Sequence, residues 1–379
     1  MTDTVRADDA GSAGSDAASA LGTGIAAVTM AAILVPVRRG VDEPAVLAAG
    51  GFALAAVLAF LARRHAGIDH RNAAIVASVS SLAVVLFSGY ALNRGLLAVV
   101  EIPIPLSGGV WSVSLVVVAF ALAGLGVGLG AADYFGVGAS GLKRRALQTA
   151  LLSGLGIIGL FVAELATLVV AVPTLIMLGI PEPSAVQLIV LSQLGMALGT
   201  GALAVGYLSL RQHNLSFIDL RVPSKRDVVW AVGGLIVLFG TLFLISFFFE
   251  ATGVESADHG TTDQAQETPQ ILLVLIPASI LVIGPFEELL YRNVIQKELY
   301  STFSRYGAVV VGSVIFAIVH TAAYWTAGPG AVIASLGVVF GLSIVLGILY
   351  ERTENLLVPA LVHGVYNAIL FGNLYLIYG

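Results

Sequence analysis

The chain has 379 residues, of which 58% are hydrophobic and only 11% charged, and its mean hydropathy is +0.96. Soluble domains carry about 25% charged residues, so this composition excludes a soluble globule and indicates a protein whose solvent is lipid. The lack of cysteine excludes disulfides, thiolate catalysis and cysteine-ligated metal sites, and no stretch is basic enough to suggest a nucleic-acid partner.

The N-terminus differs in character from the rest of the chain. Residues 1–20 are small, polar and acidic and show no hydrophobic periodicity, so we expect a disordered acidic tail. The apolar run behind them is not typical of a secretory signal peptide, because its leading flank is acidic rather than positive.

Apolar segments of membrane-helix length follow one another to the end of the chain. Because a membrane helix needs about 20 mainly apolar residues, the sequence predicts an all-α polytopic membrane protein with about eleven transmembrane helices. The first span is short and could be a re-entrant piece. The expected spans are 21–37, 44–62, 73–92, 109–131, 149–176, 185–207, 228–249, 270–290, 307–325, 331–349 and 356–377.

The short loops carry an asymmetric charge that predicts orientation. Lys and Arg gather after the second, fourth and sixth spans, whereas the 250–269 loop contains only acidic charges. By the positive-inside rule we expect a multi-pass protein of the cell membrane with its N-terminus in the cytoplasm and its C-terminus outside. Arg38 and Arg39 after the first span oppose this assignment.

Ionisable and amide side chains inside the last spans are the candidate functional residues. An ionisable residue at membrane depth is a functional hypothesis by default, although an ion pair on one helix face or a helix contact would explain any one of them. As a set, matched in depth and spacing, they favour a site. They are Glu287, Glu288 and Arg292 in span eight, His320 in span nine, and His363 and Asn367 in span eleven.

Depth along the helices predicts that these side chains meet. Glu287 and His320 each lie roughly 22–26 Å from the turn at Ser304, at about 1.5 Å per residue, so they can meet across the hairpin of spans eight and nine. His363 and Asn367 are four positions apart and point to one side of span eleven. We expect both histidines to approach Glu287 in a shared cavity in the cytoplasmic half of the membrane. Pro285 should break the helix just before the glutamates, where water could reach them.

The set contains the parts of a hydrolytic site. A carboxylate can take a proton from water, an imidazole can share that task or hold a metal, and a second imidazole with an amide can stabilise an oxyanion. Neighbouring glutamates lie about 100° apart on a helix, so they cannot share one role. Glu288 has the spacing to pair with Arg292 and position the helix, which leaves Glu287 to activate water. The sequence has no G-x-S-x-G or H-E-x-x-H stretch.

Three motifs together carry a family resemblance. EELLYR at 287–292 matches E-E-x-x-x-R, FAIVH at 316–320 matches F-x-x-x-H, and HGVYN at 363–367 matches H-x-x-x-N. In this order, each in a membrane span, they resemble the CPBP family: intramembrane proteases related to the type II CAAX prenyl endopeptidase and to bacteriocin-processing or abortive-infection proteins. LSFIDLRVPSKRD, before span seven, is similar to the family's basic segment at that place.

The resemblance implies an endopeptidase that hydrolyses a peptide bond of a membrane-associated protein or peptide, with membrane lipid as its other partner. It implies Glu/His-activated water, His/Asn oxyanion stabilisation, and Glu287, Glu288, Arg292, His320, His363 and Asn367 as the catalytic set. The family core of about eight helices would cover 106–379, with the motifs within 270–370. Residues 21–105 would then form additional N-terminal transmembrane helices.

Metal use and activity remain open at the level of sequence. Glu287, His320 and His363 could bind zinc, but no carboxylate that would orient the histidines is evident, so we favour water activation without tightly bound zinc and expect no firm cofactor. Two alternatives are a non-catalytic, immunity-type member of the same family and a polytopic transporter that uses the same residues as an ion path. No convincing internal repeat supports the transporter.

Overall fold

The computed structural model describes residues 16–65, 68–105 and 108–379. Most of the predicted acidic tail lies outside the described residues, and its last positions belong to helix α2 (Ala17–Arg38). The protein is an all-α polytopic membrane protein, and its described residues contain one small two-stranded sheet. The chain divides into two compact units. The first holds the described residues up to 146 with the short pieces 254–256 and 328–334, and the second holds the remainder.

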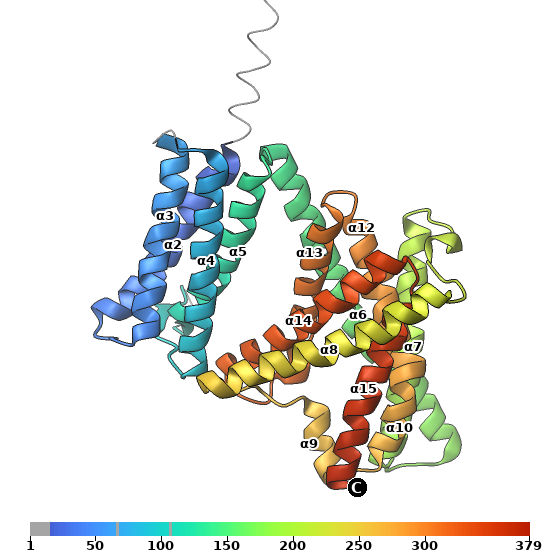
Figure 1. Ribbon diagram of the computed structural model, residues 1–379. Helices are drawn as coiled ribbons and strands as arrows, with labels where there is room; N and C mark the ends of the chain where they lie inside the picture. The colour runs from blue at the N-terminus through green and yellow to red at the C-terminus, as the bar shows by residue number, and fades with distance from the viewer. Residues whose placement is uncertain (1–15, 66–67, 106–107) are drawn as a thin grey trace, which may run out of the picture. The chain divides into compact units, whose positions relative to one another are not determined.

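The first unit is a bundle of four helices. α2 packs on α3 (Pro44–His65) and α5 (Leu115–Tyr134), and α4 (His70–Asn93) packs on α3 and α5 (Figure 1). Its buried positions are mostly alanine and serine, and small side chains allow membrane helices to approach closely. The assignment of α5 to this unit leaves the predicted boundary of the family core at 106 untested.

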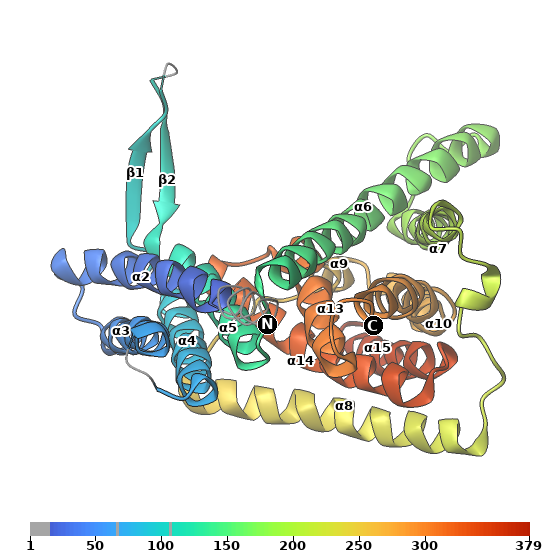
Figure 2. The same ribbon diagram turned by 90° about the horizontal axis from the view of Figure 1, so that it is seen from above.

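A β-hairpin replaces the start of the predicted fourth span. β1 (Val99–Pro103) pairs antiparallel with β2 (Val110–Ser114), and the hairpin extends away from the bundle (Figure 2). The prediction of helix from residue 109 is therefore wrong for its first residues. The stretch VWSVS alternates β-branched and aromatic residues with serine, a pattern that suits a strand, and the Ser114 side chain then accepts the Val117 N–H and starts α5.

The second unit contains the three motifs. α15 packs against α8 and against the helical segment that begins with α10 (Figure 2). α6 and α14 begin in residues assigned to the first unit and continue here. The remaining elements are α6 (Ala139–Leu178), α7 (Ala185–Leu210), η1 (Leu215–Phe217), α8 (Lys225–Thr252), α9 (Gly260–Glu267), α10 (Ile271–Ala278), α13 (Arg305–Val319), η4 (Ala322–Tyr324), α14 (Pro329–Thr353) and α15 (Leu357–Tyr378).

Ten of the eleven predicted spans are confirmed as helices long and apolar enough to cross a membrane. The ninth is not, because α13 has 15 residues and ends at Val319, where His320 caps it and the 3₁₀ turn η4 follows. The residues between His320 and Gly328 form turns, including η4, before α14 begins at Pro329. The basic residues 143–145, expected in a loop, lie instead in the first turns of the 40-residue helix α6.

The eighth span changes helical type around the glutamates. After α10 come the π-helix η2 (Ser279–Ile283), α11 (Gly284–Glu288), the π-helix η3 (Leu289–Gln296) and α12 (Lys297–Leu299), and together they form one apolar segment. The predicted break at Pro285 thus takes the form of wide π turns directly before α11. Such turns are frequent at functional sites.

Candidate active site

A buried ion pair anchors the first motif. Glu288 and Arg292 are both fully buried, and Arg292 Nε lies 2.9 Å from Glu288 Oε2, which confirms the predicted pair. The guanidinium stacks over the Phe316 ring at 4.8 Å. Its Nη1 and Nη2 atoms are buried and have no hydrogen-bond partner among the described residues. The charge of Glu288 is thus paired within its own helical segment.

His363 lies between the two glutamates. Its Nδ1 is 3.0 Å from Glu288 Oε1, and its Nε2 is 3.8 Å from Glu287 Oε2. Because a carboxylate can only accept, the Nδ1–H donates to Glu288 and the opposite nitrogen faces Glu287. Glu288 is thus the orienting carboxylate that sequence reasoning did not find. Glu287 retains 19% exposure of its side chain and has no other ion pair among the described residues.

His320 reaches the same group through the phenylalanine of its own motif. Its Nδ1 lies 2.7 Å from the Phe316 carbonyl oxygen, so Nδ1 carries the proton and Nε2 is free to accept one. The His320 ring packs on Phe316 at 4.3 Å, and the His363 ring lies 6.1 Å from the same ring. Phe316 therefore holds Arg292 and both histidines around one aromatic surface.

Asn367 makes the fewest contacts with the other residues of the predicted set. It is half-buried and lies one turn after His363 on α15, and the described residues give it no hydrogen-bond partner. The structure thus brings four of the six predicted residues into direct contact. His320 joins them through Phe316, and Asn367 shares the helix of His363.

Two aromatic side chains near His320 were missed by sequence reasoning. His259, the N-cap of α9, accepts the Thr261 N–H on Nδ1 and meets the Tyr324 ring edge-on at 5.1 Å. Burial, and secondarily the charge of His320, lower the pKa of His259 to about 4, so it is neutral at pH 7. The predicted loop around His259 has no apolar pattern, so nothing in the sequence pointed to it.

An open apolar groove borders the site. It has a volume of about 580 Å³, and Val319 and Thr321, the neighbours of His320, lie on its wall. Because its wall is mostly aliphatic, the groove suits a chain that arrives from lipid rather than from water. The other lining residues are Ile157, Leu160, Ile318, Ala322 and Trp325.

The arrangement does not fit the zinc site that the family resemblance allowed. The described residues contain no group of three or more His, Asp or Glu side chains that could hold a metal ion. The Nδ1 hydrogen bonds of His363 and His320 leave Nε2 of each ring unused, so these bonds by themselves do not argue against a metal. Protein zinc sites use three or four His, Cys, Asp or Glu ligands, and the metal content of the protein stays a prediction to be measured.

Two comparisons with known proteins match part of the chain. The family model described as Type II CAAX prenyl endopeptidase Rce1-like matches residues 269–369. The "Putative membrane peptidase YdiL" of Bacillus subtilis (strain 168) is 28% identical over 152 residues, which cover 38% of this chain and 55% of that protein. The chain thus spans about half the length of this relative. No solved structure matches. The three motifs lie within residues 287–367, inside the segment that the Rce1-like model matches, and this match together with the peptidase relative supports a CPBP family protein.

Proposed function

We propose that the protein is an intramembrane endopeptidase that hydrolyses a peptide bond of a membrane-associated protein or peptide. The observation that carries the proposal is the chain of contacts Arg292–Glu288–His363–Glu287. Three members of this chain are nine-tenths buried or more, and Glu287 has the most exposed side chain of the four. A partly hydrated carboxylate beside an oriented imidazole is the arrangement that water activation requires.

In the proposed mechanism Glu287 takes a proton from water, and the water oxygen attacks the substrate carbonyl carbon. His320, whose Nε2 is the unprotonated nitrogen, shares the proton. The His363 ring in its charged form presents Nε2–H beside Glu287, where it can donate to the oxyanion, with the Asn367 amide as a second donor. When the C–N bond breaks, the proton held by Glu287 passes to the leaving amine.

Substrate approach and orientation complete the proposal. The apolar groove beside His320 would receive a lipid-linked or membrane-embedded substrate segment. The protein would lie in the cell membrane with its N-terminus in the cytoplasm and its C-terminus outside, as the loop charges predict. The Bacillus subtilis relative is named a putative membrane peptidase, and this name does not specify a substrate.

The test compares protein termini in membranes from cells that make wild-type protein with those from cells that make Glu287→Gln. We expect new termini on membrane-associated proteins only with the wild type, and mass spectrometry of terminal peptides identifies them. Identical termini in both samples would contradict the proposal. An ion flux across proteoliposomes that Glu287→Gln abolishes would instead favour a transporter.

A further inference from the structure

We propose that Asp219 is a positioning residue that holds the Arg292 segment and the His363 helix in register. This inference rests on the proposed function, because it concerns the geometry of the same site. Asp219 lies in the non-helical connection between α7 and α8, far from the motifs in sequence and outside the residues that match the family model. Its side chain is 25% exposed.

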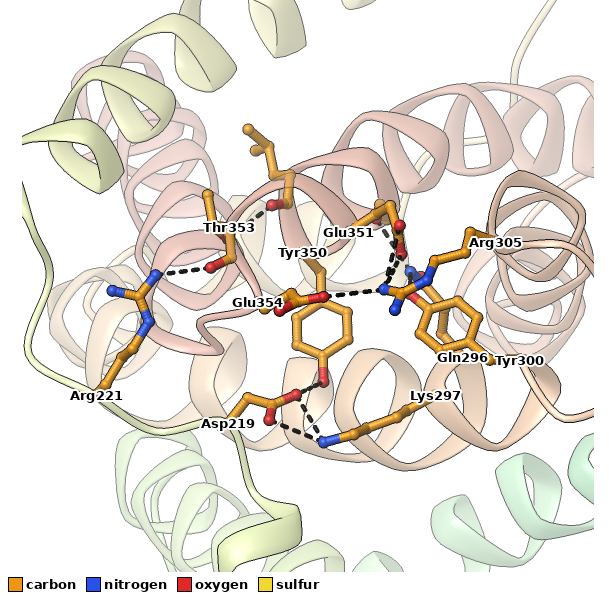
Figure 3. Close-up of polar contacts among 12 residues, drawn as sticks. Asp219, Arg221, Gln296, Lys297, Tyr300, Arg305, Tyr350, Glu351, Thr353 and Glu354 are labelled. Carbon is orange, nitrogen blue, oxygen red and sulfur yellow. Dashed lines mark hydrogen bonds and ion pairs between the residues drawn. The ribbon is translucent and has the colours of Figure 1, made fainter.

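The carboxylate of Asp219 joins two helical parts of the unit, α12 at the end of the eighth span and α14. Lys297 Nζ, from α12, lies 2.8 Å from each of its oxygens, and the Tyr350 hydroxyl, from α14, donates to Oδ2 at 2.5 Å (Figure 3). Lys297 Nζ also donates to the Phe217 carbonyl at 2.7 Å. One charged group therefore ties the connection to the end of the eighth span and to α14 at once.

The backbone of Asp219 joins the two segments that carry the site. Its N–H donates to Asn293 Oδ1 at 2.8 Å, and its carbonyl accepts the Leu356 N–H at 2.7 Å. Asn293 directly follows Arg292 in η3, and Leu356 is the residue before α15. Asn293 Oδ1 also accepts the Tyr350 hydroxyl at 3.2 Å, and Asn293 is fully buried.

These contacts give η3 a polar link to the residue before α15. Within the site, α11 meets α15 where Glu288 lies 3.0 Å from His363. π-helical turns such as η3 are less regular than an α-helix, so the pitch of this segment needs support from outside it. Without Asp219 the two segments would still touch at the site, but the distance and angle between Glu287 and His363 would vary. A misplacement of about 1 Å can cost about 100-fold in rate.

The test measures cleavage of the peptide identified by the terminal mapping, with full-length protein in detergent. For Asp219→Ala we expect kcat to fall by about 10- to 100-fold, with KM changed by less than about twofold. Both Asp219→Ala and Asp219→Asn keep the backbone bonds to Asn293 and Leu356, but only Asp219→Asn also keeps a side-chain oxygen for Tyr350, so it should recover most of the turnover. Tyr350→Phe loses the hydroxyl contacts to Asp219 and Asn293, so it should lower kcat to an intermediate value. This variant replaces Asp219→Ala in the test if Asp219→Ala does not fold.

Glu354→Gln is the matched control, because Glu354 is at the end of the same helix as Tyr350 but pairs with Arg305 at the surface. Its kcat should equal that of the wild type. A loss of thermal stability in Asp219→Ala and Tyr350→Phe with unchanged kcat per folded molecule would overturn the inference, since Asp219 would then be structural only.

Hydrogen exchange separates this inference from the proposed function. In Asp219→Ala and Tyr350→Phe, amides of 289–299 and 356–366 should exchange faster than in the wild type, while those of α7 stay unchanged. That result supports positioning even if no peptide is cleaved, in which case the proposed function has failed. Unchanged exchange in both segments would overturn the positioning role.

Discussion

Arg292 is the largest of the fully buried side chains, and it is charged. Its only ion-pair partner among the described residues is Glu288, so removal of either group leaves an unpaired charge in the interior. Glu288→Gln and Arg292→Ala should each lower the free energy of unfolding by about 3–5 kcal/mol. Urea unfolding in detergent measures this.

Glu354→Gln, which removes a surface ion pair, is the control and should change the free energy of unfolding by less than about 1 kcal/mol. If Glu288→Gln proved as stable as this control, the Glu288–Arg292 pair would have no structural role and our division of labour between the glutamates would be wrong.

His259 makes stability depend on pH. Its pKa is lowered to about 4 in the folded protein, chiefly by burial, against about 6.5 in an unfolded chain. The unfolded state therefore binds more protons between these values, so the contribution of His259 is complete above pH 6.5 and is lost as pH falls toward 4. Between pH 7 and pH 5 the melting temperature of wild type should fall more than that of His259→Gln. Parallel curves for the two proteins would refute the assignment.

Contacts within one helix could be predicted from the sequence, and contacts between helices could not. The Glu288–Arg292 pair follows from four-residue spacing, which any helix brings onto one face. The contact between Glu288 and His363 joins residues far apart in the chain, and helix depth alone placed His363 near either glutamate. Asp219 was beyond reach, because a loop residue in a basic segment gives no signal of what it touches.

At the scale of elements, Gly284 sets the approach of α11 to α15. A Cβ there would collide with the Ala360 carbonyl oxygen and lie 2.9 Å from the Gly364 nitrogen. Gly284→Ala should therefore push the glutamates away from His363, destabilise the fold by about 1–3 kcal/mol and reduce turnover. Gly240→Ala on α8 is the control, because a Cβ at Gly240 meets nothing within 4 Å.

Unfolding and cleavage, measured on both glycine variants, check this prediction. Equal behaviour of Gly284→Ala and Gly240→Ala would mean that α15 yields easily and that the close approach does not define the site.

Apolar length predicted most helices because lipid demands about 20 apolar residues per span. Apolar length gave a wrong prediction where the local sequence favours a strand or a turn. VWSVS at 110–114 pairs with the strand at 99–103, and α13 ends at Val319, where His320 caps it. The π turns of η2 and η3 were not predicted, because apolar length and periodicity do not distinguish a π turn from an α-helical one.

At the scale of the whole molecule, membrane orientation is predicted by loop charge alone. The chain has no cysteine, so single cysteines can be introduced without background. Arg144→Cys and Gln264→Cys, both at exposed positions, should react with an impermeant thiol reagent from opposite sides of the membrane, with position 144 on the cytoplasmic side. Labelling of both positions from one side would refute the orientation.

The central claim is that Glu287 activates water for peptide hydrolysis while Glu288 holds the site together. Single-turnover cleavage by purified Glu287→Gln tests it most directly, with Glu164→Gln, an exposed carboxyl group on α6, as the control. We predict that Glu287→Gln binds the peptide and unfolds like wild type but cleaves about 10²–10⁴-fold more slowly, and that Glu164→Gln cleaves normally. Near-normal cleavage by Glu287→Gln, together with a folded but inactive Glu288→Gln, would contradict the account.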